Sequence, residues 1–139
     1  MTDSIAFATD QWIKRLADEC NNNKAYQEAA RNWEGDIYFI VEPDDPQQEP
    51  IYMYMDLYHG RCRQAFVPED YNTLDPEFRI SGSLKVWRAI AKKQMDPMKA
   101  LITRQLSVKG NMTKIMRNAK AANALVNCTT KFETEFPLD

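Results

Sequence analysis

The stretch MDPMKALITRQLSVKGNMTKIMRNAKAANALV, residues 95–126, carries the signals that define the fold most sharply. Asp96-Pro97 predicts a helix start, because an acidic N-cap followed by proline at the first helical position suits the free end of a helix. Residues 106–108 (LSV) alternate like a strand, and Gly110-Asn111 predicts the start of a last long helix. We therefore expect a helix, a short strand and a helix in succession.

Upstream of this stretch, the apolar pattern changes from helical to extended and back. An apolar stripe over residues 4–20, which includes Ile5 and Ala8, predicts a first helix, and residues 26–33 predict a second that ends at Gly35. Ser81 is expected to cap a helix that runs through Gln94. Strands are predicted at residues 36–42, 51–58, 61–67, 78–80 and 106–108, with His59-Gly60 as a hairpin turn.

Length and composition restrict the class of protein. The chain has 139 residues, of which 44% are hydrophobic and 27% charged, so we expect a single globular domain over residues 1–139. No apolar run reaches the ~20 residues of a membrane span, and the acidic N-terminus lacks the basic segment of a secretory signal. Three cysteines without paired spacing fit reduced thiols better than disulfides or a metal site, which predicts a cytoplasmic protein.

Charge is distributed unevenly along the chain. Residues 1–78 carry a net charge of −10, residues 79–131 a net charge of +11, and the whole chain only −2. The split predicts either two halves that attract each other or a basic face for an anionic partner. The acidic balance, with a pI of about 5.5, argues against nucleic-acid binding, so we expect no nucleic-acid partner, and binding through residues 79–131 stays a less favoured alternative.

Catalytic and metal-binding patterns are scarce. His59 is the only histidine, and its predicted place in a hairpin turn indicates an exposed residue that is dispensable for any activity. The carboxylate pairs lie in polar loops, no glycine-rich phosphate loop is present, and no His/Cys cluster has zinc spacing. We therefore expect no enzyme activity, no catalytic residues, no metal and no cofactor.

Methionine is concentrated on a few predicted elements. Because methionine is flexible and polarizable, its clustering favours a deformable apolar cavity, although each methionine alone also fits an ordinary core position. Lys114, Arg117 and Lys120 recur every three residues on the last predicted helix, away from its apolar face. Such a stripe is either a solvated face or a surface for an anionic membrane.

One segment resembles a known family. The residues ISGSLKVWRAI (80–90) and QMDPMKALITRQLSVKGNMTKIMR (94–117) are similar to the type-two sterol carrier proteins, the nonspecific lipid-transfer domains. Their pattern contains a Ser-capped helix, a segment of the form LDPxxALMxxKLKVKGD and a closing helix. The likeness extends from about Trp12 to Val126. Two departures stand out: Lys93-Gln94, where many members have glycine, suggests a longer helix, and Arg104 replaces a residue that is often Gly or Gln.

The resemblance implies an α/β (α+β) sandwich, a five-stranded sheet with helices on one face and an apolar tunnel between them. It also implies a carrier of sterol, fatty acid or acyl-CoA that does no bond chemistry. An accessory domain serving a separate enzyme is the alternative. The resemblance and the predicted apolar faces together give the expected ligand-binding residues, which are Met53, Met55, Trp87, Met98, Leu101, Ile102, Met112, Ile115 and Met116. The expected membrane-facing residues are Lys114, Arg117 and Lys120.

Overall fold

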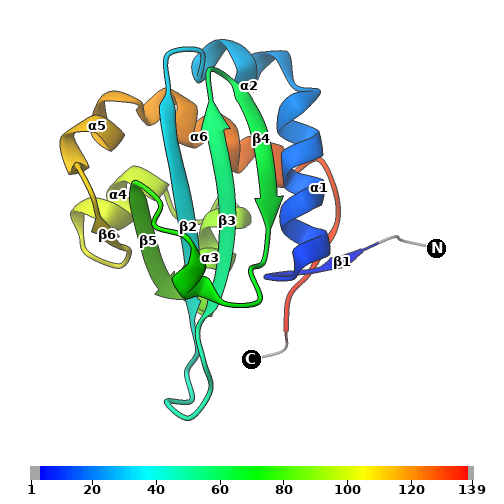
Figure 1. Cartoon of the computed structure of the whole chain (residues 1–139), viewed down its shortest axis with the longest axis vertical. Helices are drawn as coiled ribbons and strands as arrows, with labels where there is room; N and C mark the ends of the chain where they lie inside the picture. Colours follow the sequence, from blue (N-terminus) through cyan, green and yellow to red (C-terminus); the bar gives the residue numbers. More distant parts are fainter. Residues whose placement is uncertain (1–3, 138–139) are drawn as a thin grey trace.

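A five-stranded sheet forms the centre of the molecule. The computed structural model describes residues 4–137, and Figure 1 shows the sheet with the helices behind it. The strand order is β4-β3-β2-β5-β6. The predicted α/β fold with helices on one face of five strands is confirmed, and the strands are β2 (Glu34–Glu42), β3 (Ile51–Tyr58), β4 (Arg61–Phe66), β5 (Phe78–Ser83) and β6 (Ser107–Lys109).

Strand β2 occupies the middle of the sheet. It pairs antiparallel with β3, where Phe39 lies opposite Met53, and parallel with β5, where Phe39 lies opposite Ile80. Alternate side chains of a strand point to opposite faces. Phe39 therefore points to the helical face, whereas Tyr38 and Ile40 point to the other face.

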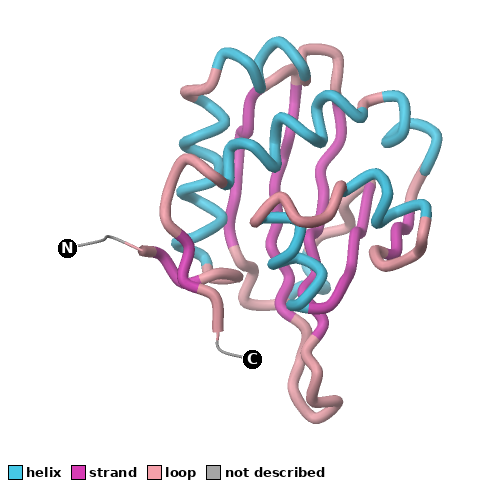
Figure 2. Tube along the Cα trace, turned by 180° about the vertical axis from the view of Figure 1, so that it is seen from behind, coloured by secondary structure: helices cyan, strands magenta, loops and turns pink. Residues whose placement is uncertain are grey.

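Within residues 4–137, six α-helices cover one face of the sheet, as seen from behind in Figure 2. Their starts are set by short polar side chains: Thr9, Asn23, Ser83 and Asn111 each accept a hydrogen bond from a backbone N–H in the first turn. The predicted helix start at Asp96-Pro97 is confirmed, although Asp96 makes no side-chain cap bond. The helices are α1 (Asp10–Asn21), α2 (Lys24–Ala29), α3 (Leu84–Ala91), α4 (Pro97–Ile102), α5 (Met112–Arg117) and α6 (Ala119–Thr129).

The opposite face of the sheet carries a smaller aromatic cluster. Tyr38, Ile40 and Tyr54 are buried there, beneath the loop that contains the 3-10 turn η1 (Tyr71–Thr73). The Tyr38 hydroxyl donates to the Tyr71 carbonyl oxygen at 2.9 Å, and the Tyr54 hydroxyl donates to an Asp36 carboxylate oxygen at 2.9 Å. Burial raises the pKa of Tyr54 most strongly, with a further contribution from Asp36, so this hydroxyl stays a donor at neutral pH.

The first turn of the predicted helix at residues 4–20 is wrong. Ile5 and Ala6 form strand β1 (Ile5–Ala6), which pairs in parallel with β7 (Thr134–Glu135) near the other end of the chain. Thr9 then caps α1 by accepting from Trp12 N at 3.1 Å. The apolar spacing of Ile5 and Ala8 fitted a helix, but the cap residue and the pairing with β7 determine where the helix begins.

Three other predicted boundaries are also wrong. The second helix ends at Ala29, and Gly35 lies in β2 rather than at a helix C-cap. Ser81 lies in β5, and Ser83 caps α3 instead. The last helix is two helices, since α5 ends at Arg117 and α6 begins at Ala119.

Lys93 and Arg104 end their helices in the left-handed conformation, with φ of 60° and 64°. The Lys93 and Gln94 N–H groups donate to the Ile90 and Ala89 carbonyls, which is the Schellman pattern. The same pair of bonds follows α4, from Arg104 and Gln105 to the carbonyls of Leu101 and Ala100. The departure at Lys93-Gln94 therefore does not lengthen α3, because Lys93 adopts the conformation that favours glycine.

The three cysteines are free thiols inside the core. Cys20 near the end of α1 and Cys128 near the end of α6 are fully buried, and Cys62 lies on β4. Burial raises the pKa of Cys62 to about 12, and contact with Cys128 together with burial raises the pKa of Cys20. The thiols of Cys20 and Cys62 are therefore protonated at neutral pH, whereas the hydrogen bond with Cys20 lowers the pKa of Cys128.

Lys93→Gly is expected to stabilise the protein by about 1 kcal/mol, because glycine adopts a positive φ without the steric cost that a Cβ adds. Arg104→Gly should act in the same direction for the same reason. The matched control is Lys99→Gly inside α4, where glycine should destabilise by about 1 kcal/mol. Urea unfolding of the three variants measures these differences. A loss of stability in Lys93→Gly as large as in Lys99→Gly would contradict the interpretation.

Candidate functional site

A cavity of about 100 Å³ lies between the sheet and the helices. Its wall has contributions from α2, β2, β3, β5, α3, α4, α5 and α6. Its wall is apolar except for Asn118, whose amide group donates to the Lys114 carbonyl at 2.8 Å. The lining residues are Tyr26, Trp33, Ile37, Phe39, Leu57, Ile80, Trp87, Ile90, Pro97, Met98, Leu101, Leu106, Ile115, Asn118, Ala121, Ala122, Leu125 and Val126.

A second apolar cavity of about 70 Å³ adjoins the first. It extends toward α1 and is bordered there by Phe7, Trp12, Ile13 and Leu16, with Met53 from the sheet. Its remaining wall is made of Ala91, Thr129 and five residues that also line the larger cavity: Phe39, Trp87, Ile90, Leu125 and Val126. The two cavities therefore lie side by side and share part of their walls.

Trp87 and Phe39 form part of the partition between the cavities. Their rings meet edge to face, with centroids 5.9 Å apart and an interplanar angle of 84°. The indole N–H of Trp87 donates to the Ile40 carbonyl at 2.9 Å, and this hydrogen bond holds the Trp87 ring of α3 against β2. Both rings line both cavities, together with Ile90, Leu125 and Val126.

A surface cleft adjoins the larger cavity beside α6. It is bordered by the α3–α4 connection, through Lys93, Met95, Asp96 and Pro97, and by Asn123, Val126 and Asn127 of α6. Ile90, Pro97 and Val126 belong both to this cleft and to the larger cavity. Figure 2 shows the α3–α4 connection running alongside α6 on the helical face. This cleft is therefore the place on the surface that borders the larger cavity beside α6.

The structure brings only part of the predicted ligand site together. Trp87, Met98, Leu101 and Ile115 line the larger cavity, and Met53 lines the smaller one together with Trp87. Met55 is fully buried but borders neither cavity, and Met112 and Met116 pack half-buried against the core outside the cavity walls. Ile102 was assigned wrongly, because it is 64% exposed on the outer side of α4.

The residues that sequence reasoning missed are mostly aliphatic and aromatic. Phe39 on β2, Ile90 on α3, and Leu125 and Val126 on α6 border both cavities. Leu106 borders the larger cavity from the segment between α4 and β6. Each lies on an apolar face that the sequence shows, but no local signal separates a residue beside a cavity from one inside a filled core.

The predicted basic stripe is broken in the structure. Lys114 is held by the fold: its ammonium group donates to the Glu34 carbonyl at 2.5 Å and to a Glu77 carboxylate oxygen at 2.7 Å. It also lies over the rings of Trp33 and Phe78, at 5.0 and 5.6 Å from their centroids. Lys114 therefore joins the basic and acidic halves of the chain, and its charge is paired within the fold.

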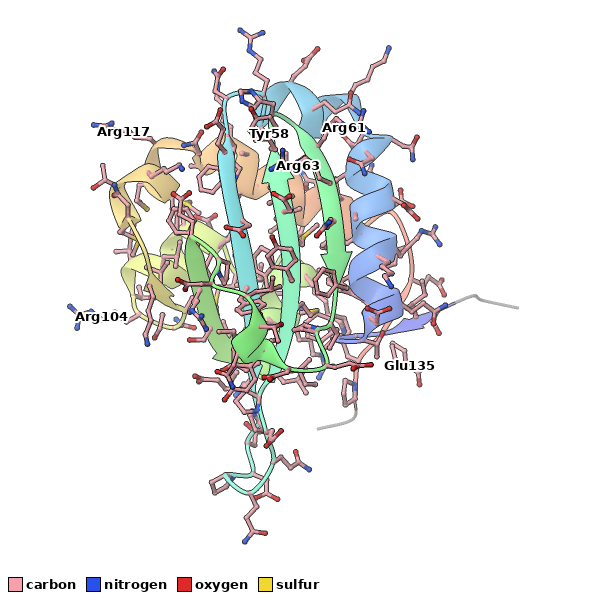
Figure 3. The ribbon with its side chains drawn as sticks, viewed as in Figure 1. Tyr58, Arg61, Arg63, Arg104, Arg117 and Glu135 are labelled. Atoms are coloured by element: carbon pink, nitrogen blue, oxygen red, sulfur yellow. The ribbon has the colours of Figure 1, made fainter. Side chains whose placement is uncertain are left out.

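Arg117 and Lys120 remain exposed on either side of the break at Asn118. Figure 3 shows the Arg117 side chain pointing away from the fold. Lys120 precedes Asn123 by three residues and so lies on the same side of α6 as the surface cleft.

His59 is exposed, as predicted, but it is not solvated on all sides. It occupies the hairpin turn with φ of 50°, and Gly60 follows with φ of 80°. Its ring nitrogens lie 2.8 Å from the Arg31 carbonyl and 2.6 Å from a Glu34 carboxylate oxygen. These two contacts secure the hairpin to Arg31 and to Glu34 at the start of β2. His59 is not among the lining residues of either cavity.

Residues 4–137 hold neither a metal-ion cluster nor a membrane-spanning helix. No cluster of three or more His, Cys, Asp or Glu side chains suited to a metal ion occurs within this range. None of the helices found there combines the length and apolar character needed to cross a bilayer.

Comparison with known proteins identifies the family. A model of the SCP-2 sterol transfer family matches residues 13–123. The chain belongs to the SCP-2 sterol transfer family. The match includes the α3, α4 and α5 segments that resembled the type-two sterol carrier proteins in sequence, and it includes most of the lining of both cavities. No curated protein sequence matches the chain.

Solved structures of SCP-2 proteins share the fold over nearly the whole chain. A crystal structure of sterol carrier protein 2 is 28% identical, with a TM-score of 0.82 over 91% of this chain and 98% of that one. A solution structure of a conserved hypothetical protein from Thermus thermophilus, described as possibly sterol carrier protein, is 26% identical, with a TM-score of 0.83 over 97% of both chains. The fold and the family are thus established by independent comparisons.

Leu101→Ala and Ile102→Ala should differ sharply in stability. Leu101 is 3% exposed and borders the cavity, so its truncation should cost about 2–4 kcal/mol, from lost apolar burial and an enlarged void. Ile102 is 64% exposed, so its truncation should cost under about 0.5 kcal/mol. Denaturant unfolding compares the two neighbours on one helix, and equal losses would place Ile102 in the core.

Proposed function

We propose that this SCP-2 family member binds the long apolar chain of a lipid across the two cavities and carries it without bond chemistry. The observation that carries the proposal is the pair of adjoining apolar cavities, whose walls share five residues. Apolar burial contributes ~25 cal/mol per Å², so a long chain gains several kcal/mol there without a specific polar contact. Residues 1–139 are proposed to act as one lipid-binding domain.

A long ligand requires the cavities to widen and join. Their volumes are about 100 and 70 Å³, and a dry cavity of ~150 Å³ accommodates only a molecule the size of benzene. The side chains that must move are Phe39 and Trp87 in the partition, together with Leu125 and Val126 of α6, which are only partly buried. Displacement of side chains and of α6 is therefore part of the proposed binding step.

The ligand class is proposed from the relatives and the cavity wall. A sterol carrier protein-2 from Aedes aegypti, 14% identical with a TM-score of 0.56, is described as a complex with the fatty acid palmitate. Fatty acids, acyl-CoA and sterols all offer a long apolar body that suits an apolar wall. Three free cysteines support a reducing, cytoplasmic location.

Freshly purified protein should carry lipid in an equimolar complex, which native mass spectrometry detects and identifies. Ala122→Phe, which places a ring in the larger cavity, should lower affinity for a 16-carbon fatty acid by more than tenfold. Ala89→Phe is the matched control, because Ala89 is half-buried on α3 but borders neither cavity. If the parent binds no lipid and instead copurifies with an enzyme, the chain is an accessory domain.

We also propose that Arg117 and Lys120 meet an anionic membrane when lipid is transferred. Each basic residue near such a surface contributes about 1 kcal/mol, so Arg117→Glu/Lys120→Glu should slow transfer from anionic vesicles by more than tenfold. Transfer from neutral vesicles should be unchanged. The control is Lys99→Glu/Lys109→Glu, which alters net charge equally at exposed sites on α4 and β6. If both double variants slow transfer equally, the effect comes from net charge alone and the proposed role of Arg117 and Lys120 is wrong.

A further inference from the structure

A second surface cleft, of about 340 Å³, lies between the start of α2 and the end of α6. Its lining residues are Asn23, Ala25, Lys93, Ala124, Asn127, Thr130 and Lys131. The set differs from that of the cavities, because it contains two lysines, two asparagines and a threonine but no aromatic residue. We call it the basic cleft.

The charged residues that line the basic cleft are both lysines. No carboxylate belongs to its lining, and within residues 4–137 neither Lys93 nor Lys131 forms an ion pair. Asn23 accepts from Tyr26 N through its side-chain oxygen, which leaves its NH₂ group to donate outward. The cleft therefore presents cationic and neutral donors together, which suits an anion with several oxygen acceptors.

The basic cleft connects to the apolar interior through shared walls. Lys93 and Asn127 border both this cleft and the cleft beside the α3–α4 connection. That second cleft shares Ile90, Pro97 and Val126 with the larger cavity. The path from the lysines to the cavity thus follows one side of α6, whose far side Figure 1 shows covered by the sheet.

Lys93 is held in place by its backbone. The two Schellman bonds at the end of α3 fix the left-handed turn, so the Lys93 side chain extends from a fixed backbone position between the two clefts. Asp96 borders only the cleft beside the α3–α4 connection. An anion near Lys93 therefore gains by lying toward Lys131 and away from Asp96.

We propose that the basic cleft binds the anionic head group, carboxylate or phosphate, of the lipid whose chain occupies the cavities. This inference rests on the proposed function and adds the class of ligand. An unpaired carboxylate inside the apolar cavities would lose its hydration without a partner, so the head group must stay at the surface. The cleft places Lys93 and Lys131 where the chain emerges, and a neutral head group gains nothing from them.

The experiment compares Lys93→Gln/Lys131→Gln with the parent. Glutamine removes the charge but keeps the strain of a side chain at the left-handed position of residue 93, so stability is matched. Affinities for palmitate and hexadecanol are measured at about pH 8, where the carboxylate is ionised. The control is Lys99→Gln/Lys109→Gln, two exposed lysines outside both clefts.

Two solvent-exposed charge contacts predict a palmitate affinity about three- to tenfold lower in the double variant, with hexadecanol affinity unchanged. The control should change neither. Lys93→Gly should bind palmitate more weakly and yet unfold at a higher denaturant concentration than the parent. Weaker binding by a more stable variant shows that the loss of the charge, and not a loss of folding, lowers the affinity. An equal change for both ligands, or no change for either, would overturn the inference and leave lipid binding intact. Failure of the parent to bind both ligands would overturn the proposed function itself.

Inorganic phosphate alone distinguishes the lipid head group from a free anion. Millimolar phosphate should bind the parent far more weakly than palmitate and displace it little, because the chain supplies most of the affinity. Phosphate binding as tight as palmitate binding, and abolished in Lys93→Gln/Lys131→Gln, would make the cleft a site for a free anion and overturn the assignment to a lipid.

Discussion

The parallel pairing of β2 with β5 is the constraint on which the rest of the structure depends. Strand β2 is hydrogen-bonded along both edges, so it fixes β3 and β4 on one side and β5 and β6 on the other. Strand β5 continues directly into α3 through the Ser83 cap. The register of β5 therefore sets the position of Trp87, whose indole bonds back to β2 at Ile40. The boundary of the two cavities follows from that one pairing.

Much of the sheet could be predicted from the sequence because its signals are local. Runs of aromatic and β-branched residues mark β2 and β3, and His59-Gly60 marks the hairpin between β3 and β4. At Gly60 a side chain would also collide with the Gln27 backbone, since an added Cβ would lie 2.5 Å from its carbonyl oxygen. Turn chemistry and packing thus specify the same residue.

The errors arose where a distant contact or a rare backbone conformation decides the outcome. The pairing of β1 with β7 joins the two ends of the chain and leaves no trace in local periodicity. Lys93 and Arg104 end helices as glycine usually does, so composition alone suggested that α3 continued. At the site, the apolar faces were recognisable, but the space between them depends on how tightly distant helices pack. The emphasis on methionine was misplaced for Met55, Met112 and Met116, because none of them borders a cavity.

The buried thiols have a consequence for the kinetics of the molecule. Cys20 and Cys128 meet where α1 contacts α6, the helix that borders both cavities. A fully buried thiol reacts with an alkylating reagent only while the residues that cover it are displaced. The alkylation rate of Cys20 and Cys128 in the native protein therefore records how often α6 separates from α1. The two thiols thus report the opening of the helical layer at the contact between its first and last helices.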